Sequence, residues 1–146
     1  MIQNSDLHIE EFFFNSCKDG RYDSVKEILT KYPYLLHHKT KEGWSAIIIA
    51  SFWQRLKLVD FLIKHGSNPN DVGKNGTSVL MYAKTKMLDC KNPNLSLLEL
   101  LIDAGAKIEH EDNYGKDIFF YLDNKAKSGK IIINYFNAKK SKKSIL

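Results

Sequence analysis

A ten-residue pattern occurs three times in this chain. Its copies are Lys41–Ala50 (KEGWSAIIIA), Lys74–Ala83 (KNGTSVLMYA) and Asn113–Leu122 (NYGKDIFFYL). Each copy has a glycine at its third position, a short oxygen-bearing side chain two residues later, and then a run of apolar residues. The glycines follow one another at intervals of 33 and 39 residues. A period of this length predicts an array of stacked supersecondary units rather than one layered domain.

The residues after each glycine predict the first helix of a unit. Ser45, Ser78 and Asp117 each carry an oxygen that can accept a hydrogen bond from the free N–H groups of a helix N-terminus. The apolar run that follows would form the buried face of that helix. The β-branched run Ile47–Ile49 by itself favours a strand. Because the pattern repeats as a whole, we predict a helix here as well.

A second helix follows in two of the units. In Leu56–Gly66 and Leu95–Gly105, apolar residues recur at the spacing of one helix face. The glycine at the end of each segment suits the left-handed residue that follows a helix. The segment Ser67–Asn70 (SNPN) is typical of a turn. Each unit is therefore a helix, a tight turn, a second helix and an extended turn.

These units resemble those of the ankyrin-repeat family. The family signature Thr-Pro-Leu-His-x-Ala is similar to Ser45–Ala50 (SAIIIA), Ser78–Ala83 (SVLMYA) and Asp117–Leu122 (DIFFYL). The family ending Gly-Ala-Asp-x-Asn is similar to Gly66–Asn70 (GSNPN) and Gly105–Glu109 (GAKIE). The signature proline and histidine are absent from every copy. The third unit also carries an insertion between its two helices.

The resemblance implies an all-α fold, an α-solenoid of helix–turn–helix units joined by β-hairpin-like turns, with a capping unit at each end. Stacked units of this kind bury a continuous core that no unit could bury alone. We predict a single ankyrin-repeat domain over residues 1–137, with units at about 6–39, 40–72, 73–111 and 112–137, and a basic C-terminal tail at 138–146.

The positive charge of the chain is concentrated near its C-terminal end. Of the 22 lysine and arginine residues, seven lie from Lys125 onward, where there is no acidic residue. The formal net charge of +5 therefore hides a slightly acidic body. A short basic segment can associate with nucleic acid, an anionic membrane or an acidic partner. We expect this one to be a solvated, frayed terminus.

The sequence predicts no enzyme and no cofactor. It contains no Gly-rich phosphate loop, nucleophile elbow or zinc-protease motif. The adjacent His37 and His38 could meet His8 or His65, but no cysteine or carboxylate at ligand spacing supports a metal site. We expect Cys17 to be a packed thiol.

Three features of the sequence point to a cytoplasmic location. The two cysteines have no metal or disulfide pattern, which is typical of a reducing compartment. The first residues include acids and no basic region, so we expect no signal peptide. No apolar run is long enough for a membrane helix, and we expect no membrane insertion.

The resemblance also implies where a partner protein would bind. Ankyrin arrays are expected to meet their partners through the turn tips and the inner, concave side of the first helices. The implied partner-binding residues are Lys41, Glu42, Trp44, Phe52, Trp53, Lys74, Asn75, Thr77, Lys86, Asn113, Tyr114 and Lys116. We expect Trp44, Phe52 and Trp53 to form an exposed aromatic patch, and exposed aromatic clusters mark interaction sites. Alternatively, the N-terminal segment or the basic tail covers them.

The expected function is protein–protein interaction, without a small-molecule substrate. The small size and the composition rich in Lys, Asn and Ile favour an inhibitor or immunity-type protein that neutralises a cognate toxin. A host-directed effector or a scaffold is one alternative. Association of the lysine-rich tail with nucleic acid or an anionic surface is another, and the slightly acidic body argues against it.

Overall fold

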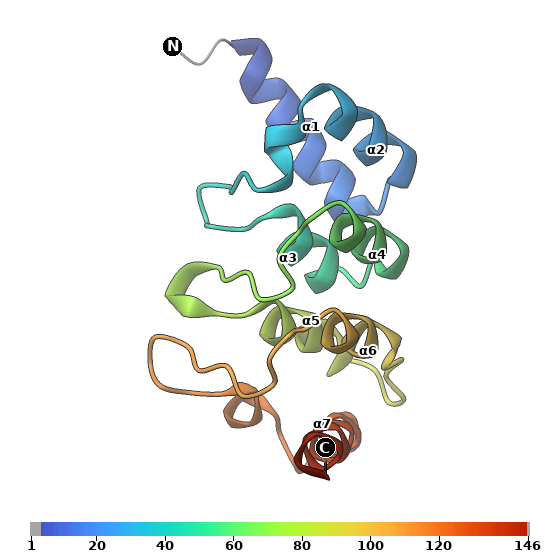
Figure 1. Ribbon diagram of the computed structural model, residues 1–146, viewed down its shortest axis with the longest axis vertical. Helices are drawn as coiled ribbons and strands as arrows, with labels where there is room; N and C mark the ends of the chain where they lie inside the picture. The colour runs from blue at the N-terminus through green and yellow to red at the C-terminus, as the bar shows by residue number, and fades with distance from the viewer. Residues whose placement is uncertain (1–3, 146) are drawn as a thin grey trace.

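The computed structural model describes residues 4–145 as an elongated stack of helix pairs (Figure 1). In chain order the helices are α1 (Asn4–Asp19), α2 (Tyr22–Lys31), η1 (Pro33–Leu36), α3 (Ala46–Phe52), α4 (Leu56–Lys64), η2 (Lys74–Gly76), α5 (Val79–Met87), α6 (Ser96–Asp103), η3 (Ile118–Tyr121) and α7 (Lys127–Ile145), where η marks a 3₁₀ helix. The described residues contain no strand, and a single β-bridge joins Val72 to Ser78. The predicted all-α solenoid is confirmed.

The helix pairs lie one below another, and the segments between pairs project to one side as hairpins (Figure 1). The order is α1 with α2, α3 with α4, α5 with α6, and η3 with α7. α3 lies at the centre because it packs against α1, α4 and α5. The buried side chains of all four pairs form one hydrophobic core. No helix of residues 4–145 has the length and apolar character needed to cross a membrane.

The central position of α3 explains its unusual sequence. Every residue from Ala46 to Ser51 is buried. A helix that is apolar all round is stable when neighbouring elements cover all its sides. The run Ile47–Ile49 therefore forms a helix despite its β-branched side chains, because packing outweighs intrinsic propensity.

The helix ends follow the sequence prediction with one exception. The Ser78 hydroxyl accepts a hydrogen bond from the backbone N–H of Met81 (3.3 Å), and Asp117 accepts one from the N–H of Phe120 (3.2 Å). Ser45 is also an N-cap residue but makes no capping bond. Its hydroxyl instead donates to the Asp71 carboxylate (2.5 Å), which belongs to the next hairpin. The predicted cap at Ser45 is therefore wrong in its bonding.

The second helices end in matching ways. Gly66 and Gly105 both have a φ of +104°, as the sequence predicted. The next residue donates its N–H back to the helix in each case, from Ser67 to the Leu62 carbonyl and from Ala106 to the Leu101 carbonyl, both at 2.9 Å. These bonds form the Schellman motif, which satisfies carbonyls at the end of a helix.

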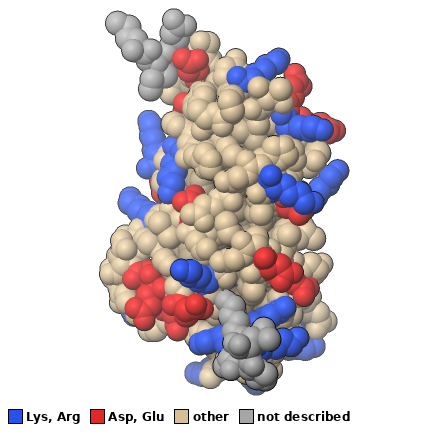
Figure 2. Space-filling view, viewed as in Figure 1, with Lys and Arg blue, Asp and Glu red and all other residues tan. Residues whose placement is uncertain are grey.

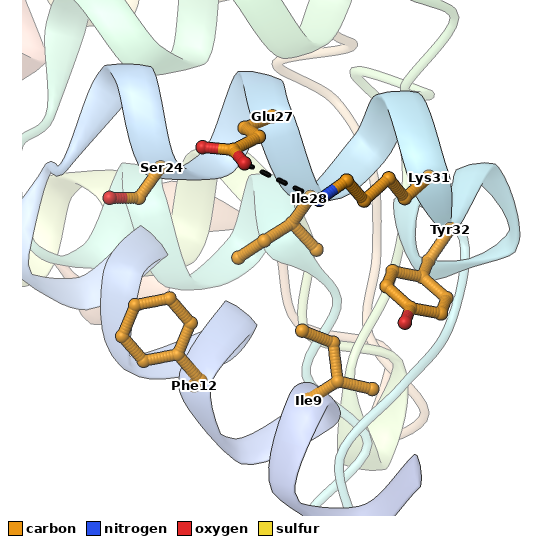
Figure 3. A pocket seen from close by; sticks show the side chains of 7 residues that line it. All are labelled: Ile9, Phe12, Ser24, Glu27, Ile28, Lys31 and Tyr32. Atoms are coloured by element: carbon orange, nitrogen blue, oxygen red, sulfur yellow. Dashed lines mark hydrogen bonds and ion pairs between the residues drawn. The ribbon is translucent and has the colours of Figure 1, made fainter. Parts of the chain in front are cut away.

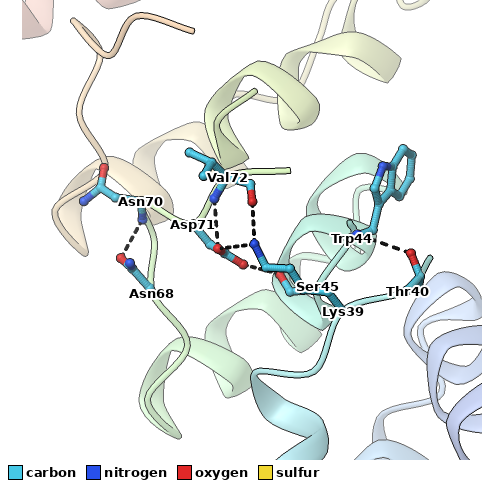
Figure 4. A network of polar contacts seen from close by, with 8 residues as sticks. All are labelled: Lys39, Thr40, Trp44, Ser45, Asn68, Asn70, Asp71 and Val72. Carbon is cyan, nitrogen blue, oxygen red and sulfur yellow. Dashed lines mark hydrogen bonds and ion pairs between the residues drawn. The ribbon is translucent and has the colours of Figure 1, made fainter. Parts of the chain in front are cut away.

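Polar side chains tie each unit to its neighbours. Lys39 joins the hairpin that begins the second unit to the one that begins the third, with Nζ 2.6 Å from the Val72 carbonyl and 3.1 Å from Asp71 Oδ1 (Figure 4). Gln54 donates to the Ala83 carbonyl at 2.6 Å. Asn70 donates to the Gly105 carbonyl at 2.9 Å. In each of these hydrogen bonds the acceptor is a backbone carbonyl. The relative position of neighbouring units therefore does not depend on the side chain of the accepting residue.

The fourth unit departs most from the others. Its first helix is η3, a 3₁₀ helix of four residues. Its closing helix is α7, which begins at Lys127 and continues to Ile145 through the segment predicted as a tail. Within this segment Lys139 pairs with Glu99 (3.5 Å) and lies over the Tyr135 ring. The described part of this segment is therefore helical rather than frayed, whereas most of its described side chains are exposed, as expected.

Candidate partner-binding face

The hairpins and the first helices together form one surface. We call it the inner face and define it as residues 40–44, 73–78 and 112–116 together with α3 and its C-cap residue Trp53, α5 and η3. It contains a cavity of about 350 Å³, which we call the inner pocket. The pocket is lined by Phe52, Asn75, Thr77, Met81, Tyr82, Lys84, Thr85, Asp112, Tyr114 and Tyr121. Because these residues come from three units, the pocket forms only in the stacked array.

An aromatic cluster lies beside the inner pocket and consists of Trp44, Phe52, Trp53 and Tyr82. The Trp44 ring centroid is 5.2 Å from that of Phe52 and 5.1 Å from that of Tyr82. The Phe52 and Trp53 rings meet edge to face at 5.4 Å. Aromatic pairs at such distances stabilise each other beyond their burial.

The aromatic cluster is half-buried rather than exposed. Trp44, Phe52 and Trp53 all have intermediate exposure, and Trp44, Trp53 and Tyr82 pack against the core. The expected exposed patch is therefore wrong in degree, because each ring covers its neighbour. The more exposed aromatic side chains of this face are Tyr114, at 66%, and Phe120, at 61%.

Lysine ammonium groups lie over the aromatic rings of this face. Lys86 Nζ, from the third unit, is 4.5 Å from the centroid of a Trp53 ring. Lys18 Nζ, from the first unit, is 4.9 Å from a ring centroid of the same tryptophan. In the fourth unit, Lys116 Nζ is 3.4 Å from the Phe120 ring centroid. A cation over an aromatic ring is attracted by the negative face of the ring. The inner face is thus both aromatic and basic.

The other predicted residues occupy different parts of the inner face. Phe52, Asn75, Thr77 and Tyr114 line the inner pocket. Glu42, Trp44 and Lys74 line a second hollow of about 490 Å³, together with Thr40 and Ile49. Lys41 lines a separate, shallow hollow together with Glu42 and Lys74. Asn113 lies in neither hollow, and its backbone N–H bonds to the Asn75 carbonyl (2.9 Å).

The sequence prediction missed Lys84, which is the most unusual residue of the inner pocket. Its side chain is 8% exposed, and burial lowers the pKa of its ammonium group. In the repeat alignment it takes the place of Ser51, which is fully buried. That alignment was the available signal, since it places a long charged side chain where the array buries a small one.

Asp112 and Tyr121 were also missed, and together they shape the wall of the inner pocket. The Tyr121 hydroxyl donates to Asp112 Oδ2. Asp112 Oδ1 accepts from the backbone N–H groups of Tyr114 (2.9 Å) and Lys116 (3.1 Å). The Tyr121 hydrogen bond is the main reason that the pKa of Asp112 lies below its usual range. Asp112 therefore organises the fourth hairpin.

A further cavity lies in the N-terminal unit (Figure 3). It has a volume of about 320 Å³ and is lined by Ile9, Phe12, Ser24, Glu27, Ile28, Lys31 and Tyr32. The two charged groups are paired, with Lys31 Nζ 3.5 Å from Glu27 Oε1. This cavity offers an apolar surface without an unpaired charge.

The histidines and cysteines do not gather into a site. Among the described residues there is no group of three His, Cys, Asp or Glu side chains that could hold a metal ion. His38 Nε2 is 3.2 Å from Glu10, and the His65 ring lies on Phe61. Cys17 is fully buried, and burial raises the pKa of its thiol, whereas Cys90 is exposed.

Comparison with known families agrees with this architecture. The family model for ankyrin repeats, with three copies, matches residues 13–112. This chain belongs to the ankyrin-repeat family. Ankyrin repeats are generally protein–protein interaction modules and are typically not enzymes. The matched region ends at Asp112, so it leaves out the pattern of the fourth unit.

The ankyrin-repeat chain is similar to several longer proteins. It is 31% identical over 104 residues to an ankyrin repeat protein of Acanthamoeba polyphaga mimivirus, covering 58% of this chain and 16% of the relative. A second ankyrin repeat protein of that virus is 27% identical over 110 residues, covering 68% and 18%. An inactive serine/threonine-protein kinase of Bos taurus is 31% identical over 100 residues, covering 68% and 6%. The chain spans less than a fifth of the length of each relative.

Proposed function

We propose that this ankyrin-repeat chain binds a partner protein through its inner face. The observation that carries the proposal is the joint placement of the aromatic cluster, the inner pocket and several lysines on one surface built from three units. Aromatic side chains beside polar groups are typical of binding hot spots, because they desolvate a large area at little conformational cost.

The site residues of the proposal are those implied by the family, with additions from the structure. Trp44, Phe52 and Trp53 form its centre, and Lys86 and Lys116 extend it along the stack. Tyr82, Lys84 and Tyr121 join them as lining residues of the inner pocket. Half-burial suits this role, since rings held by their neighbours lose little freedom when a partner binds.

An inhibitor or immunity-type protein, which neutralises a cognate toxin by covering it, is the finer role that we propose from the sequence. A scaffold or a host-directed effector is the alternative. Two of the relatives are viral proteins, and this supports the host-directed alternative. For all these roles, the first step is identification of the partner.

The test is affinity capture from the cells that express the chain, with three baits compared by mass spectrometry. Alanine variants of the half-buried rings would disturb packing, so we choose Lys86→Glu, which reverses a charge over Phe52 and Trp53. The matched control is Lys26→Glu, an exposed lysine on α2. We expect one protein to be retained by wild type and Lys26→Glu and lost by Lys86→Glu, with unchanged helical circular dichroism. Equal retention by all three baits would exclude the inner face as the binding site.

The lysine-rich segment does not carry a second proposal. Lys139 is held by Glu99 and Tyr135, and Lys140 lies over the Phe119 ring (5.0 Å). Figure 2 shows basic and acidic side chains interspersed over one face, with acidic side chains gathered over the segment between α6 and η3. Proteins that bind nucleic acid through its phosphates present a continuous basic patch, and the face in Figure 2 is mixed in charge.

A further inference from the structure

Lys84 carries a buried charge for which the described part of the chain provides no counter-ion. Its side chain is 8% exposed, and it makes neither an ion pair nor a hydrogen bond with any described residue. Its Nζ lies 5.6 Å from the centroid of the Tyr121 ring. A lysine side chain that is almost wholly covered by the protein and has no polar partner is uncommon, and its ammonium group is costly to withdraw even partly from water. A residue of this kind in a binding pocket points to a ligand that supplies the missing charge.

The acidic residue that lines the same pocket, Asp112, makes no ion pair with Lys84. Its two oxygens accept hydrogen bonds from the Tyr121 hydroxyl and from two backbone N–H groups. The carboxylate is therefore committed to the fourth hairpin. The pocket is also lined by tyrosine phenols: burial raises the pKa of Tyr82, and the hydrogen bond to Asp112 raises that of Tyr121.

The surroundings of the pocket favour a negatively charged occupant. Lys86 lies over Phe52, which lines the pocket. Lys18 lies over Trp53 of the aromatic cluster, and Lys116 lies over Phe120, the neighbour of the lining residue Tyr121. The Thr85 hydroxyl in its lining already donates to the Met81 carbonyl (3.1 Å), and the Thr77 hydroxyl also lines the pocket. A single negative group could therefore meet Lys84 in a site already partly shielded from water.

We propose that the inner pocket receives a carboxylate from an acidic segment of the partner protein, and that Lys84 is the cation that pairs with it. This proposal rests on the proposed function and specifies the chemistry of the partner. The cost of withdrawing the Lys84 ammonium from water is met when the chain folds, so the carboxylate gains an attraction that water screens only weakly. Neighbouring apolar side chains of the same segment would then contact the aromatic cluster.

A carboxylate fits the charge pattern better than a nucleic-acid backbone. The inner pocket offers one buried ammonium group, and Asp112 lies in the same lining. Glu42 lies in the adjoining hollow. A chain of phosphates following the inner face would pass both carboxylates, and this repulsion disfavours a polyanion. An acidic residue within a mixed polar and apolar peptide avoids it.

The test uses the whole chain as bait for a phage-displayed library of random twelve-residue peptides. Wild type, Lys84→Met and Lys91→Met are screened in parallel, since Lys91 is an exposed lysine outside the inner face and serves as the matched control. Lys84→Met replaces a buried charge with an apolar chain of similar length, so we expect it to fold. Wild type and Lys91→Met should both enrich peptides with an Asp or Glu at fixed spacing from an aromatic residue, and Lys84→Met should not.

A double-mutant cycle then compares one enriched peptide and its Glu→Gln or Asp→Asn form, each bound to wild type and to Lys84→Met. Fluorescence anisotropy measures the four dissociation constants. We expect the neutral peptide to bind wild type about tenfold or more weakly, because it leaves the buried ammonium unpaired. Lys84→Met should bind the two peptides within about twofold of each other. If neutralising the peptide lowers its affinity equally for wild type and for Lys84→Met, the assignment of Lys84 is overturned.

Absence of acidic enrichment on wild type would overturn the proposal in every case. Enriched uncharged peptides that Lys86→Glu still weakens would overturn it while leaving the inner face as a protein-binding surface. Preference for a labelled single-stranded DNA oligonucleotide over the acidic peptides, abolished by Lys84→Met, would overturn the peptide and assign the pocket to phosphate.

Discussion

The third and fourth units begin with the same sequence pattern and fold differently after it. In the third unit the pattern leads into α5, an α-helix of nine residues whose first three residues are all buried. In the fourth unit it leads into η3, a 3₁₀ helix of four residues in which Ile118 alone is buried. The difference shows that the pattern specifies where a helix starts, whereas the neighbouring unit determines how far it continues.

The neighbour of each unit accounts for this contrast. α5 is packed between α3 and η3, and α6 pairs with it. η3 has α5 on one side, and the described chain next supplies α7, which contacts it through the edge-to-face pair of Phe119 and Phe136. With less surface to cover it, the fourth unit leaves Phe120 and Tyr114 exposed. These exposed rings are then available for binding.

The strongest test of this contrast is a pair of core truncations at matching positions. Leu80 is 1% exposed in α5, and Phe119 is the half-buried residue at the same place in η3. We expect Leu80→Ala to lower the free energy of unfolding by about 3 kcal/mol, because it leaves a cavity in the centre of the stack. Phe119→Ala should cost less, although it removes more atoms. Urea unfolding followed by circular dichroism measures both, and the reverse order would contradict the contrast.

The turn glycines provide a second matched pair. Gly76 and Gly115 have nearly equal φ angles of +72° and +70°. A Cβ atom at Gly76 would lie 2.6 Å from Asn113 Oδ1, whereas one at Gly115 meets nothing within 4 Å. Gly115→Ala should therefore cost about 1 kcal/mol from backbone strain alone, and Gly76→Ala about 2 kcal/mol because the next hairpin must also move. Equal losses in thermal unfolding would show that the hairpins are not in firm contact.

Lys84→Met should stabilise the chain while it weakens binding. The charged form of Lys84 is less favourable in the folded chain than in the unfolded chain, because burial lowers the pKa of its ammonium group. Removing it should raise the free energy of unfolding by about 1 kcal/mol, the usual size of a stabilising change at a functional residue. Urea unfolding at neutral pH is the measurement, with Lys91→Met as the control expected to change little. A marked loss of stability would mean that Lys84 has a structural partner.

The smallest effect concerns the fourth hairpin and is seen as a dependence on pH. The pKa of Asp112 is lowered in the folded chain, chiefly by the Tyr121 hydroxyl, so its contribution to stability is present above its ordinary pKa. That contribution is lost as the pH falls through the ordinary value, about 4, toward the lower folded value. Wild type should therefore lose more stability than Asp112→Asn on acidification from about pH 6 to about pH 3. Parallel losses would indicate that Asp112 contributes no net charge effect.

Much of the fold could be predicted because its signals are local. Ser78 as a cap, Gly66 and Gly105 after their helices, and the apolar spacing of the second helices all act within a few residues. The features in which the structure differs from the sequence prediction depend on contacts between units. Ser45 bonds to Asp71 rather than to its own helix, and no local rule connects residues so far apart in sequence.

The candidate site shows the same division. Family resemblance supplied Trp44, Phe52 and Trp53, and the structure places them together in the aromatic cluster. Their half-burial depends on Tyr82 from the next unit, so the sequence pattern of one unit could not reveal it. Lys84 was missed because its burial depends on what the fourth unit places over it. Whether these residues bind a partner stays a prediction.

The enclosure of α3 has a consequence for how the chain acquires its structure. A seven-residue helix is not stable in isolation, so α3 should form only when α1, α4 and α5 pack around it. Folding should therefore begin with several central elements condensing at once, and the outer ones should join later. Amide hydrogens of α3 and α5 should then exchange with solvent most slowly, and protection should decline toward both ends of the stack. A partner bound to the inner face would also slow the exchange of amide hydrogens in the fourth unit.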